Sequence, residues 1–185
     1  MKMPSLAWLM MVGGISSAQA VEYTQLHANQ SNLTFAPRLM GVPVEGRFNR
    51  FSSQLTFDPQ LPDHAKISLV VDLASIDAGS QEANDEVIGQ TWLNIKTFPT
   101  ATFVSDQVKT LGANRFEVTG KLAIKGKTHT VSVPFTYKTE EKRGVFDGEF
   151  VLKRADFAIG EGQWADFETI ANEIQIHFHV VATPQ

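Results

Sequence analysis

Apolar residues alternate with polar or small ones along most of the chain, and this period of two is the feature that most constrains its fold. The alternation is clearest at residues 116–124, 131–137 and 174–180. Successive side chains of a strand point to opposite faces, so each run has one apolar face. The first two runs flank a turn around Gly126 and predict an antiparallel hairpin. Together with shorter runs elsewhere, the alternation predicts an all-β, antiparallel fold of about eight strands separated by short turns.

One segment departs from the period of two. In residues 82–95, "EANDEVIGQTWLNI", the apolar side chains recur at steps of one, four and three residues, which fits one face of a helix. Ser80 stands where an N-cap is expected, and Pro99 is expected to stop the helix. The sequence therefore predicts one short helix laid across an opening or a side of the sheet.

Three glycines lie inside predicted strands, on the apolar parity. Gly46, Gly120 and Gly148 each precede a large apolar residue by two positions. Glycine in a strand marks a bend or a close approach. Strands that curl into a barrel need such positions, because a Cβ would be crowded on the concave side. The apolar parity also slips near Asn49-Arg50, which predicts a bulge there. We expect a closed barrel; a flat two-sheet sandwich with incidental glycines is the alternative.

The first twenty residues have the composition of a secretory signal peptide. A lysine is followed by an apolar run and by small residues that end in Ala18-Gln19-Ala20. We predict cleavage after Ala20 and a periplasmic location. A membrane anchor is the alternative, but the apolar run is shorter than the about 20 residues that span a bilayer. The remaining residues, 21–185, fit one domain.

Composition and motifs argue against several classes of function. The chain has no cysteine, which excludes disulfides and thiolate chemistry. Its net charge is −4, and removal of a signal peptide with one lysine and no acid leaves −5, so a basic surface for nucleic acid is not expected. Gly-x-Ser-x-Gly, His-Glu-x-x-His and phosphate-loop motifs are missing. We therefore predict a protein that is not an enzyme and carries no cofactor.

Two histidines one residue apart near the C-terminus raise the question of a metal site. His177 and His179 share one strand face, a spacing suited to gripping a cation. Their parity is opposite to that of the apolar residues, so we expect them to face water. A zinc site needs a third ligand, and His27, His64 and His129 lie in predicted turns or termini. We predict no metal.

The predicted interior is rich in aromatic residues. The chain has thirteen phenylalanines and three tryptophans, and many of them fall on the inward parity. An eight-stranded barrel is either filled by its side chains or holds one small ligand. Composition alone favours the filled core; a hollow barrel with such a wall would take a hydrocarbon.

A series of short motifs follows in fixed order along nearly all of residues 21–185. They are Gly46-x-Phe48-x-x-Phe51, Phe57-Asp58-Pro59, Ser75-Ile76, Phe98-Pro99, "VTGKLAIKGKTHTV" at 118–131, "RADFAIG" at 154–160 and "ANEIQI" at 171–176. In this series the chain resembles the YceI-like family of periplasmic, lipocalin-like proteins that bind polyisoprenoid lipids. One departure is Asn84 to Ile88, where the family often carries Arg-Asp and His-Leu pairs.

The resemblance implies an eight-stranded lipocalin-like barrel that holds an isoprenoid chain, such as a quinone tail or a carrier lipid. The residues expected to line it are Phe48, Leu69, Val71, Phe103, Leu122, Ile124, Val133, Phe135, Phe150, Ile176 and Phe178. Those expected at its rim are Val87, Trp92 and Trp164. The function expected is that of a periplasmic binding or carrier protein. The alternative is an accessory protein that docks on a membrane electron-transfer partner of the cytochrome b type, with the barrel partly filled.

Two features near the expected rim have two readings each. The loop at residues 160–168, "GEGQWADFE", is either a flexible flap or a plain connection in which Trp164 plugs one end of the barrel. Arg154 and Asp156 form either a structural ion pair that braces this loop or a contact for a ligand headgroup.

Overall fold

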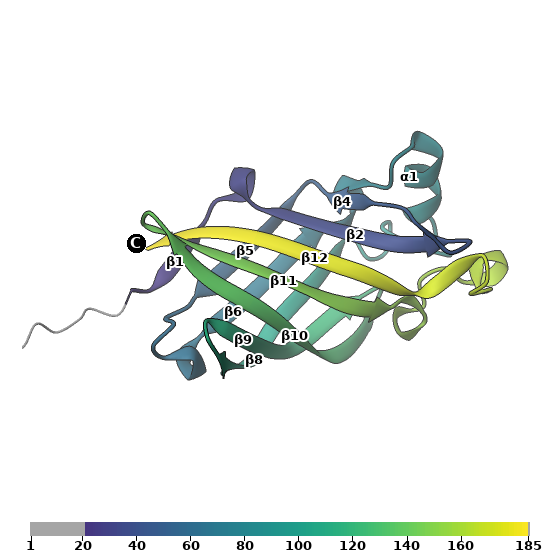
Figure 1. Cartoon of the computed structure of the whole chain (residues 1–185). Helices are drawn as coiled ribbons and strands as arrows, with labels where there is room; N and C mark the ends of the chain where they lie inside the picture. The colour runs from purple at the N-terminus through teal and green to yellow at the C-terminus, as the bar shows by residue number, and fades with distance from the viewer. Residues whose placement is uncertain (1–20, 185) are drawn as a thin grey trace, which may run out of the picture.

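The computed structural model describes residues 21–184, which form one curled antiparallel sheet with a short helix at one end (Figure 1). The predicted signal peptide lies outside these residues. Among the described residues, no helix is long and apolar enough to cross a membrane. The strands are β1 (Tyr23–Leu26), β2 (Asn32–Leu39), β3 (Val42–Pro43), β4 (Gly46–Phe48), β5 (Phe51–Thr56), β6 (Lys66–Asp72), β7 (Ile76–Asp77), β8 (Thr100–Gly112), β9 (Arg115–Ile124), β10 (Lys127–Glu140), β11 (Arg143–Lys153) and β12 (Ile170–Pro184). The helix is α1 (Gln81–Val87), and short 3-10 turns are η1 (Ala28–Gln30), η2 (Pro62–His64), η3 (Leu73–Ser75), η4 (Arg154–Phe157) and η5 (Gly162–Trp164).

These strands occupy eight positions around a barrel. The hydrogen-bonded order is β5-β6-β8-β9-β10-β11-β12-β2-β4-β7. Because β4 runs directly into β5, and β6 into β7 through η3, each pair is one bent strand that serves two parts of the ring. The two ends of this order, β5 and β7, continue β4 and β6, which lie near the opposite ends, so the sheet closes into a ring. This confirms the predicted all-β barrel. The strand count differs from the prediction because bent strands are divided in two and because β1 and β3 are short additions paired with β12 and β2.

The bend between β4 and β5 falls at Asn49-Arg50, as the slip in apolar parity predicts. Ser75 satisfies the backbone there, since its side-chain oxygen accepts from the Arg50 N–H at 2.9 Å and donates to the Asp72 carbonyl at 2.7 Å. Its carbonyl accepts from the Asn49 backbone N–H at 3.1 Å. The bend turns Phe48 and Phe51 to the same inner face although they are three residues apart.

The in-strand glycines carry the curvature. A Cβ added to Gly46 would clash with the ring of Phe35, its partner on β2, and one added to Gly148 would clash with the ring of Phe178, its partner on β12. At Gly120 the obstacles are the Phe103 ring and a backbone carbonyl of β8. In each case an aromatic ring of a neighbouring strand packs against the glycine, an arrangement that fixes the strand register while the sheet curls. The sandwich alternative is thereby excluded.

The helix is shorter than predicted. α1 ends at Val87, and residues 88–98 form successive turns rather than helix, so the predicted span of 82–95 is wrong beyond its first half. The N-cap prediction is right, since the Ser80 side chain accepts from the Ala83 N–H at 3.2 Å. The helix ends early because Gly89 follows Ile88, and the apolar side chains beyond it pack by turns onto the barrel.

One end of the barrel is filled by an aromatic cluster. It lies where β1 and the C-terminus meet, at the left of Figure 1, and consists of Tyr23, Phe57, Phe116, Phe135, Tyr137 and Phe146. Phe57 is fully buried and its ring stands edge-on to Phe116 and Phe146, at centroid distances of 5.2 Å. The Tyr23 and Tyr137 hydroxyls share a hydrogen bond of 2.8 Å. Burial raises the pKa of Tyr137 to about 12, so its hydroxyl stays neutral at physiological pH.

Replacement of Gly148 by alanine tests the role of the in-strand glycines. We expect Gly148→Ala to lower the free energy of unfolding by about 1–3 kcal/mol, because the new methyl overpacks the Phe178 ring. Urea denaturation measures the change. The control is the double mutant with Phe178→Leu, which removes the ring and should show a coupling energy of about 0.5–3 kcal/mol. Strictly additive effects would contradict the packing of Phe178 on Gly148.

Candidate ligand-binding cavity

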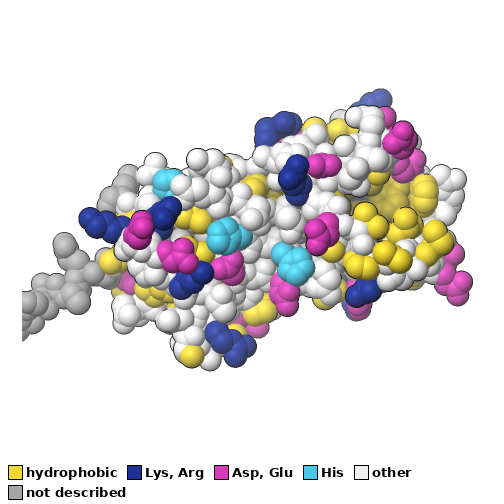
Figure 2. Space-filling view, turned by 45° about the horizontal axis from the view of Figure 1, so that its top comes forward, with side chains coloured by type: hydrophobic (Ala, Val, Ile, Leu, Met, Phe, Trp, Pro, Cys, Tyr) yellow, Lys and Arg dark blue, Asp and Glu magenta, His cyan; other side chains and the backbone are white. Residues whose placement is uncertain are grey.

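The half of the barrel opposite the aromatic cluster is hollow. Its cavity measures about 660 Å³ and opens at the end that carries α1 and the β2–β3 hairpin. Figure 2 shows hydrophobic side chains gathered around a hollow at that end of the molecule. Along β12 the wall runs from Ile170 to Val180, which is roughly 33 Å of strand at the usual rise. The space is therefore long, and its shape suits a chain better than a compact ring system.

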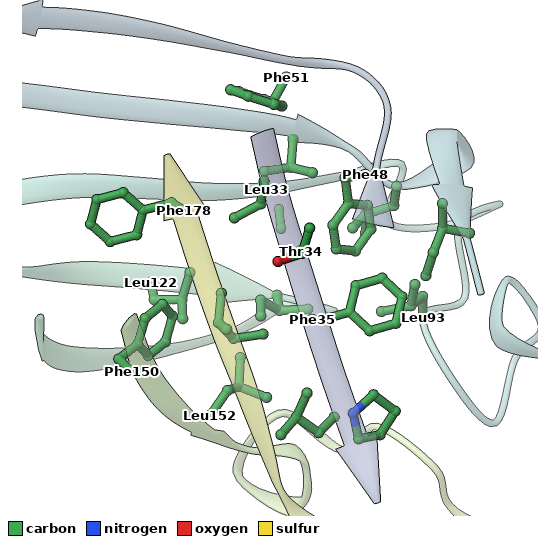
Figure 3. Close-up of a pocket in the computed structure, with 18 of the residues that line it drawn as sticks. Leu33, Thr34, Phe35, Phe48, Phe51, Leu93, Leu122, Phe150, Leu152 and Phe178 are labelled. Carbon is green, nitrogen blue, oxygen red and sulfur yellow. The ribbon is translucent and has the colours of Figure 1, made fainter. Parts of the chain in front are cut away.

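All residues expected to line the barrel lie on the wall of this cavity, and so do the three expected at its rim. Figure 3 shows several of them, with Leu122, Phe150 and Phe178 turned into the space between β12, β2 and the strands behind. Whether they bind a ligand stays a prediction. Their common position follows from strand parity, because inward side chains alternate with outward ones along every strand.

The structure adds wall residues that the sequence analysis did not single out. Leu33 and Phe35 come from β2, and Leu93 comes from the turns after α1. Leu33 and Phe35 follow the same period of two, so their position on the wall could have been predicted from the sequence. The position of Leu93 could not have been predicted in this way, because it depends on how the turns at 88–98 fold back onto the barrel.

Charged groups on the wall are few and all of one sign. Glu45, Glu82 and Glu86 are the only ionisable residues among the described ones that line the cavity. Glu82 and Glu86 stand on α1, and Glu45 precedes β4, so the three carboxylates belong to the open end. The rest of the wall is almost entirely hydrocarbon, which makes it suited to an apolar guest.

Two tryptophans meet at the mouth. The rings of Trp92 and Trp164 lie 5.8 Å apart between centroids. Trp164 donates its Nε1–H to the Glu86 carboxylate at 2.6 Å, which ties the loop of η5 to α1. Trp92 is 7% exposed and lies deeper, beside Leu93. Val87 completes this side of the rim.

Arg154 organises the backbone around the mouth. Its guanidinium is 1% exposed and donates six hydrogen bonds to backbone carbonyls. The acceptors are the carbonyl oxygens of Ile159, Gly160, Trp164, Asp166, Ile170 and Ala171, at 2.8–3.4 Å. Burial lowers the pKa of Arg154, and the Asp166 charge opposes that shift. Among the described residues Arg154 forms no ion pair, so the predicted pair with Asp156 is wrong, and a headgroup contact finds no free N–H.

The loop at 160–168 is held rather than free. Lys125, in the turn between β9 and β10, donates to the Ala158 carbonyl at 2.5 Å and pairs with Glu161 at 2.8 Å. Gly160 has a φ of +75°, and a Cβ there would strike the Arg154 guanidinium. These contacts tie the loop to Arg154 and to the turn between β9 and β10, and Trp164 lines the open end of the cavity.

The two C-terminal histidines face outward, as predicted. His177 pairs with Glu149 at 3.2 Å and His179 with Asp147 at 2.6 Å, each across the β11–β12 ladder. Within residues 21–184 no group of three or more metal-ligating side chains is placed to hold an ion. The prediction that His129 lies in a turn is wrong: it belongs to β10 and stands against the Phe157 ring.

Fold and cavity together define a β-barrel that encloses an elongated apolar site, a lipocalin-like architecture. The family model of the YceI-like domain matches residues 25–182, and the chain belongs to that family.

Known relatives agree with this assignment. A UPF0312 protein of Azotobacter vinelandii is 32% identical over 120 residues, which cover 62% of each chain. The structure is similar to that of Burkholderia cenocepacia BcnA, with 42% identity, a TM-score of 0.84 and coverage of 85% of this chain and 99% of the other. It shares its fold with a polyisoprenoid binding domain from Saccharophagus degradans, at 15% identity, a TM-score of 0.68 and coverage of 90% and 100%.

Removal of the Arg154 guanidinium tests its role at the mouth. We expect Arg154→Met to lower the free energy of unfolding by about 3 kcal/mol or more, because buried carbonyls lose their donor. Amide hydrogen exchange at residues 159–171 should rise more than in the aromatic cluster. Arg115→Met, at an exposed arginine of β9, is the control and should stay within about 0.5 kcal/mol of the parent. Equal losses in both variants would refute the assignment.

Proposed function

We propose that the protein binds and carries a long isoprenoid lipid, a polyprenyl chain or a quinone tail, in the bacterial periplasm. The observation that carries the proposal is the elongated cavity of about 660 Å³, whose wall is apolar from the aromatic cluster to the mouth. The Saccharophagus degradans domain, described as polyisoprenoid binding, has the same fold and supports this ligand class. The signal peptide predicted from the sequence of residues 1–20 supports the periplasmic location.

Burial of hydrocarbon supplies the affinity. Each CH₂ group moved from water into the cavity contributes about 0.8 kcal/mol, so a chain of several isoprene units binds without any polar contact. The rings of Phe35, Phe103 and Phe178 each pack against an in-strand glycine of a neighbouring strand, and all three line the cavity. Such a site selects for the length and width of the chain.

Extraction of the purified protein tests the ligand. The protein is produced in a bacterial periplasm, extracted with organic solvent, and the extract is analysed by mass spectrometry. A polyprenyl or quinone species in near-stoichiometric amount is the expected result. Repeated recovery of no lipid would refute the proposal.

A tryptophan placed in the cavity tests the site. Ile176 is partly exposed to the hollow half, so Ile176→Trp should displace most of the bound lipid while the free energy of unfolding changes by less than about 1 kcal/mol. Lipid content and thermal unfolding are the two measurements. An Ile176→Trp variant that keeps its lipid but unfolds much earlier would show that this part of the barrel is a packed core.

Two control variants place the same side chain outside the cavity and at its filled end. Gln175→Trp adds the same side chain at the next position of β12, on the exposed face, and should leave lipid content unchanged. Val133→Trp places it beside the filled end, where Val133 is 5% exposed and packs in the aromatic cluster, and should cost about 1–3 kcal/mol of stability.

Docking on a membrane electron-transfer protein is the second candidate function. The observation that favours it is the apolar tip of the β2–β3 hairpin, where Leu39, Met40 and Val42 are 39%, 74% and 63% exposed. Phe167, 48% exposed, lies in the loop beside it, since the Met40 N–H donates to the Thr169 carbonyl. Clusters of exposed apolar side chains mark interaction sites.

A photo-cross-linker at position 42 separates the two functions in intact cells. Docking predicts capture of one membrane protein from this position and none from the exposed position Gln175. Capture of no membrane protein would remove this candidate and leave the carrier function untouched.

A further inference from the structure

Five exposed apolar side chains form a patch beside the opening of the cavity. Four lie in or next to the β2–β3 hairpin and the fifth in the loop at 160–168, and together they are called the mouth patch: Leu39, Met40, Val42, Val44 and Phe167. The two segments lie side by side at the open end (Figure 1), since the Met40 N–H donates to the Thr169 carbonyl at 2.8 Å. Leu39 and Val44 also line the cavity. The apolar wall of the cavity therefore continues onto the outer surface of the barrel.

The residue at the tip of the hairpin is not the one that local structure favours. Met40 and Gly41 are the two central residues of the turn, and both have a positive φ, of +47° and +83°. Such a turn favours Asn-Gly, because a bulky side chain is strained at positive φ. Met40 is nevertheless 74% exposed, so it buries little surface in the fold in return for that strain. Its side chain suits an apolar partner outside the chain.

The backbone of the hairpin tip is paired within the chain. Besides the bond from the Met40 N–H, the Gly41 carbonyl accepts from the Arg38 guanidinium at 3.2 Å. The Val44 N–H donates to the Pro37 carbonyl at 2.9 Å, and β3 pairs with β2 at both of its residues. A protein partner can supply donors and acceptors to unpaired backbone groups, whereas the hydrocarbon of a bilayer cannot. A tip whose backbone groups are already paired is therefore suited to contact with lipid.

Phe167 is held in place by the buried cation of the mouth. The Arg154 guanidinium lies 4.9 Å from the centre of the Phe167 ring, a cation–π contact that fixes the ring, and yet the side chain is 48% exposed. Its neighbours Asp166 and Glu168 are exposed carboxylates, which are costly to bury in hydrocarbon. Apolar side chains flanked by charged ones are typical of segments that lie at the interface of a membrane. The loop therefore fits the headgroup level of a bilayer and not its centre.

We propose that the mouth patch docks on the surface of a lipid bilayer, with Met40 and Phe167 inserted at the headgroup level and the cavity open toward the membrane. The use of this surface for uptake and release of lipid rests on the proposed function. A ligand that resides in a bilayer then enters the barrel without exposing its tail to water. Because acidic side chains flank the patch, apolar contact drives the docking, and anionic lipids do not strengthen it.

Flotation with protein-free vesicles of phosphatidylcholine, a zwitterionic lipid, tests the docking surface. The parent protein should float with the vesicles. Met40→Asn should lower the vesicle partition coefficient by about tenfold, the effect of one apolar side chain leaving the membrane. Its thermal unfolding should occur at the same temperature or higher, because asparagine is favoured at this position of the turn. A loss of binding in Met40→Asn is therefore not a loss of folding.

Two exposed valines provide a matched control. Val42 is 63% exposed in the mouth patch, and Val104 is 53% exposed on β8, outside the patch. Val42→Ser should weaken vesicle binding and Val104→Ser should not. Because the chain has no cysteine, Val42→Cys and Val104→Cys each give a single site for an environment-sensitive fluorophore. Vesicles should shift the emission to shorter wavelength at position 42 alone, and an equal shift at both positions would overturn the proposal.

Other results would also overturn the docking surface. They are failure of the parent protein to float, binding that requires anionic lipid and disappears at high salt, and binding only to vesicles that carry membrane proteins. Self-association that is lost in Met40→Asn, without vesicle binding, would assign the patch to a second copy of the chain. Organic extraction separates this inference from the proposed function. A protein that yields isoprenoid lipid but does not float would overturn the docking surface alone, and one that floats but yields no lipid would refute the carrier function alone.

Discussion

Close contact between aromatic rings and in-strand glycines is the constraint on which the barrel depends. A sheet of long strands closes only if its concave face has room, and Gly46, Gly120 and Gly148 provide that room on three different strands. The rings of Phe35, Phe103 and Phe178 on neighbouring strands occupy the space that a Cβ would take. The same three glycines therefore let the sheet curl and let large aromatic side chains fit on its inner face.

Different interactions stabilise the two ends of the barrel. At the filled end, edge-on rings around Phe57 exclude water and close the core. At the open end a second cluster of buried apolar residues surrounds the inner part of the cavity, and one guanidinium, that of Arg154, binds the polar backbone of residues 159–171. This buried cation, surrounded by carbonyl dipoles, fixes the conformation of the loop without occupying the cavity. This division lets one barrel combine a rigid base with a mouth built from loops.

Period-two alternation was sufficient to predict the strands, the outward histidines and the positions of the wall residues, because strand parity is local. The closed barrel was predicted from the in-strand glycines and from the slip in parity near Asn49-Arg50. The helix was predicted too long, because a helix and a series of turns that bury the same side chains can have the same apolar spacing at 88–95. Arg154 was expected to brace the loop at 160–168, but its partners were predicted wrongly for another reason. Its six acceptors are backbone carbonyls, which carry no signature in the sequence, so only the fold brings them together.

The blind end of the cavity has a consequence for ligand size. Because the cluster around Phe57 and Phe116 closes the base, a hydrocarbon can enter only from the mouth and must stop at a fixed depth. Each methylene that does not fit stays in water and forgoes about 0.8 kcal/mol. For the proposed lipid, the distance between the aromatic cluster and the two tryptophans would therefore set the longest tail that fits entirely inside the barrel.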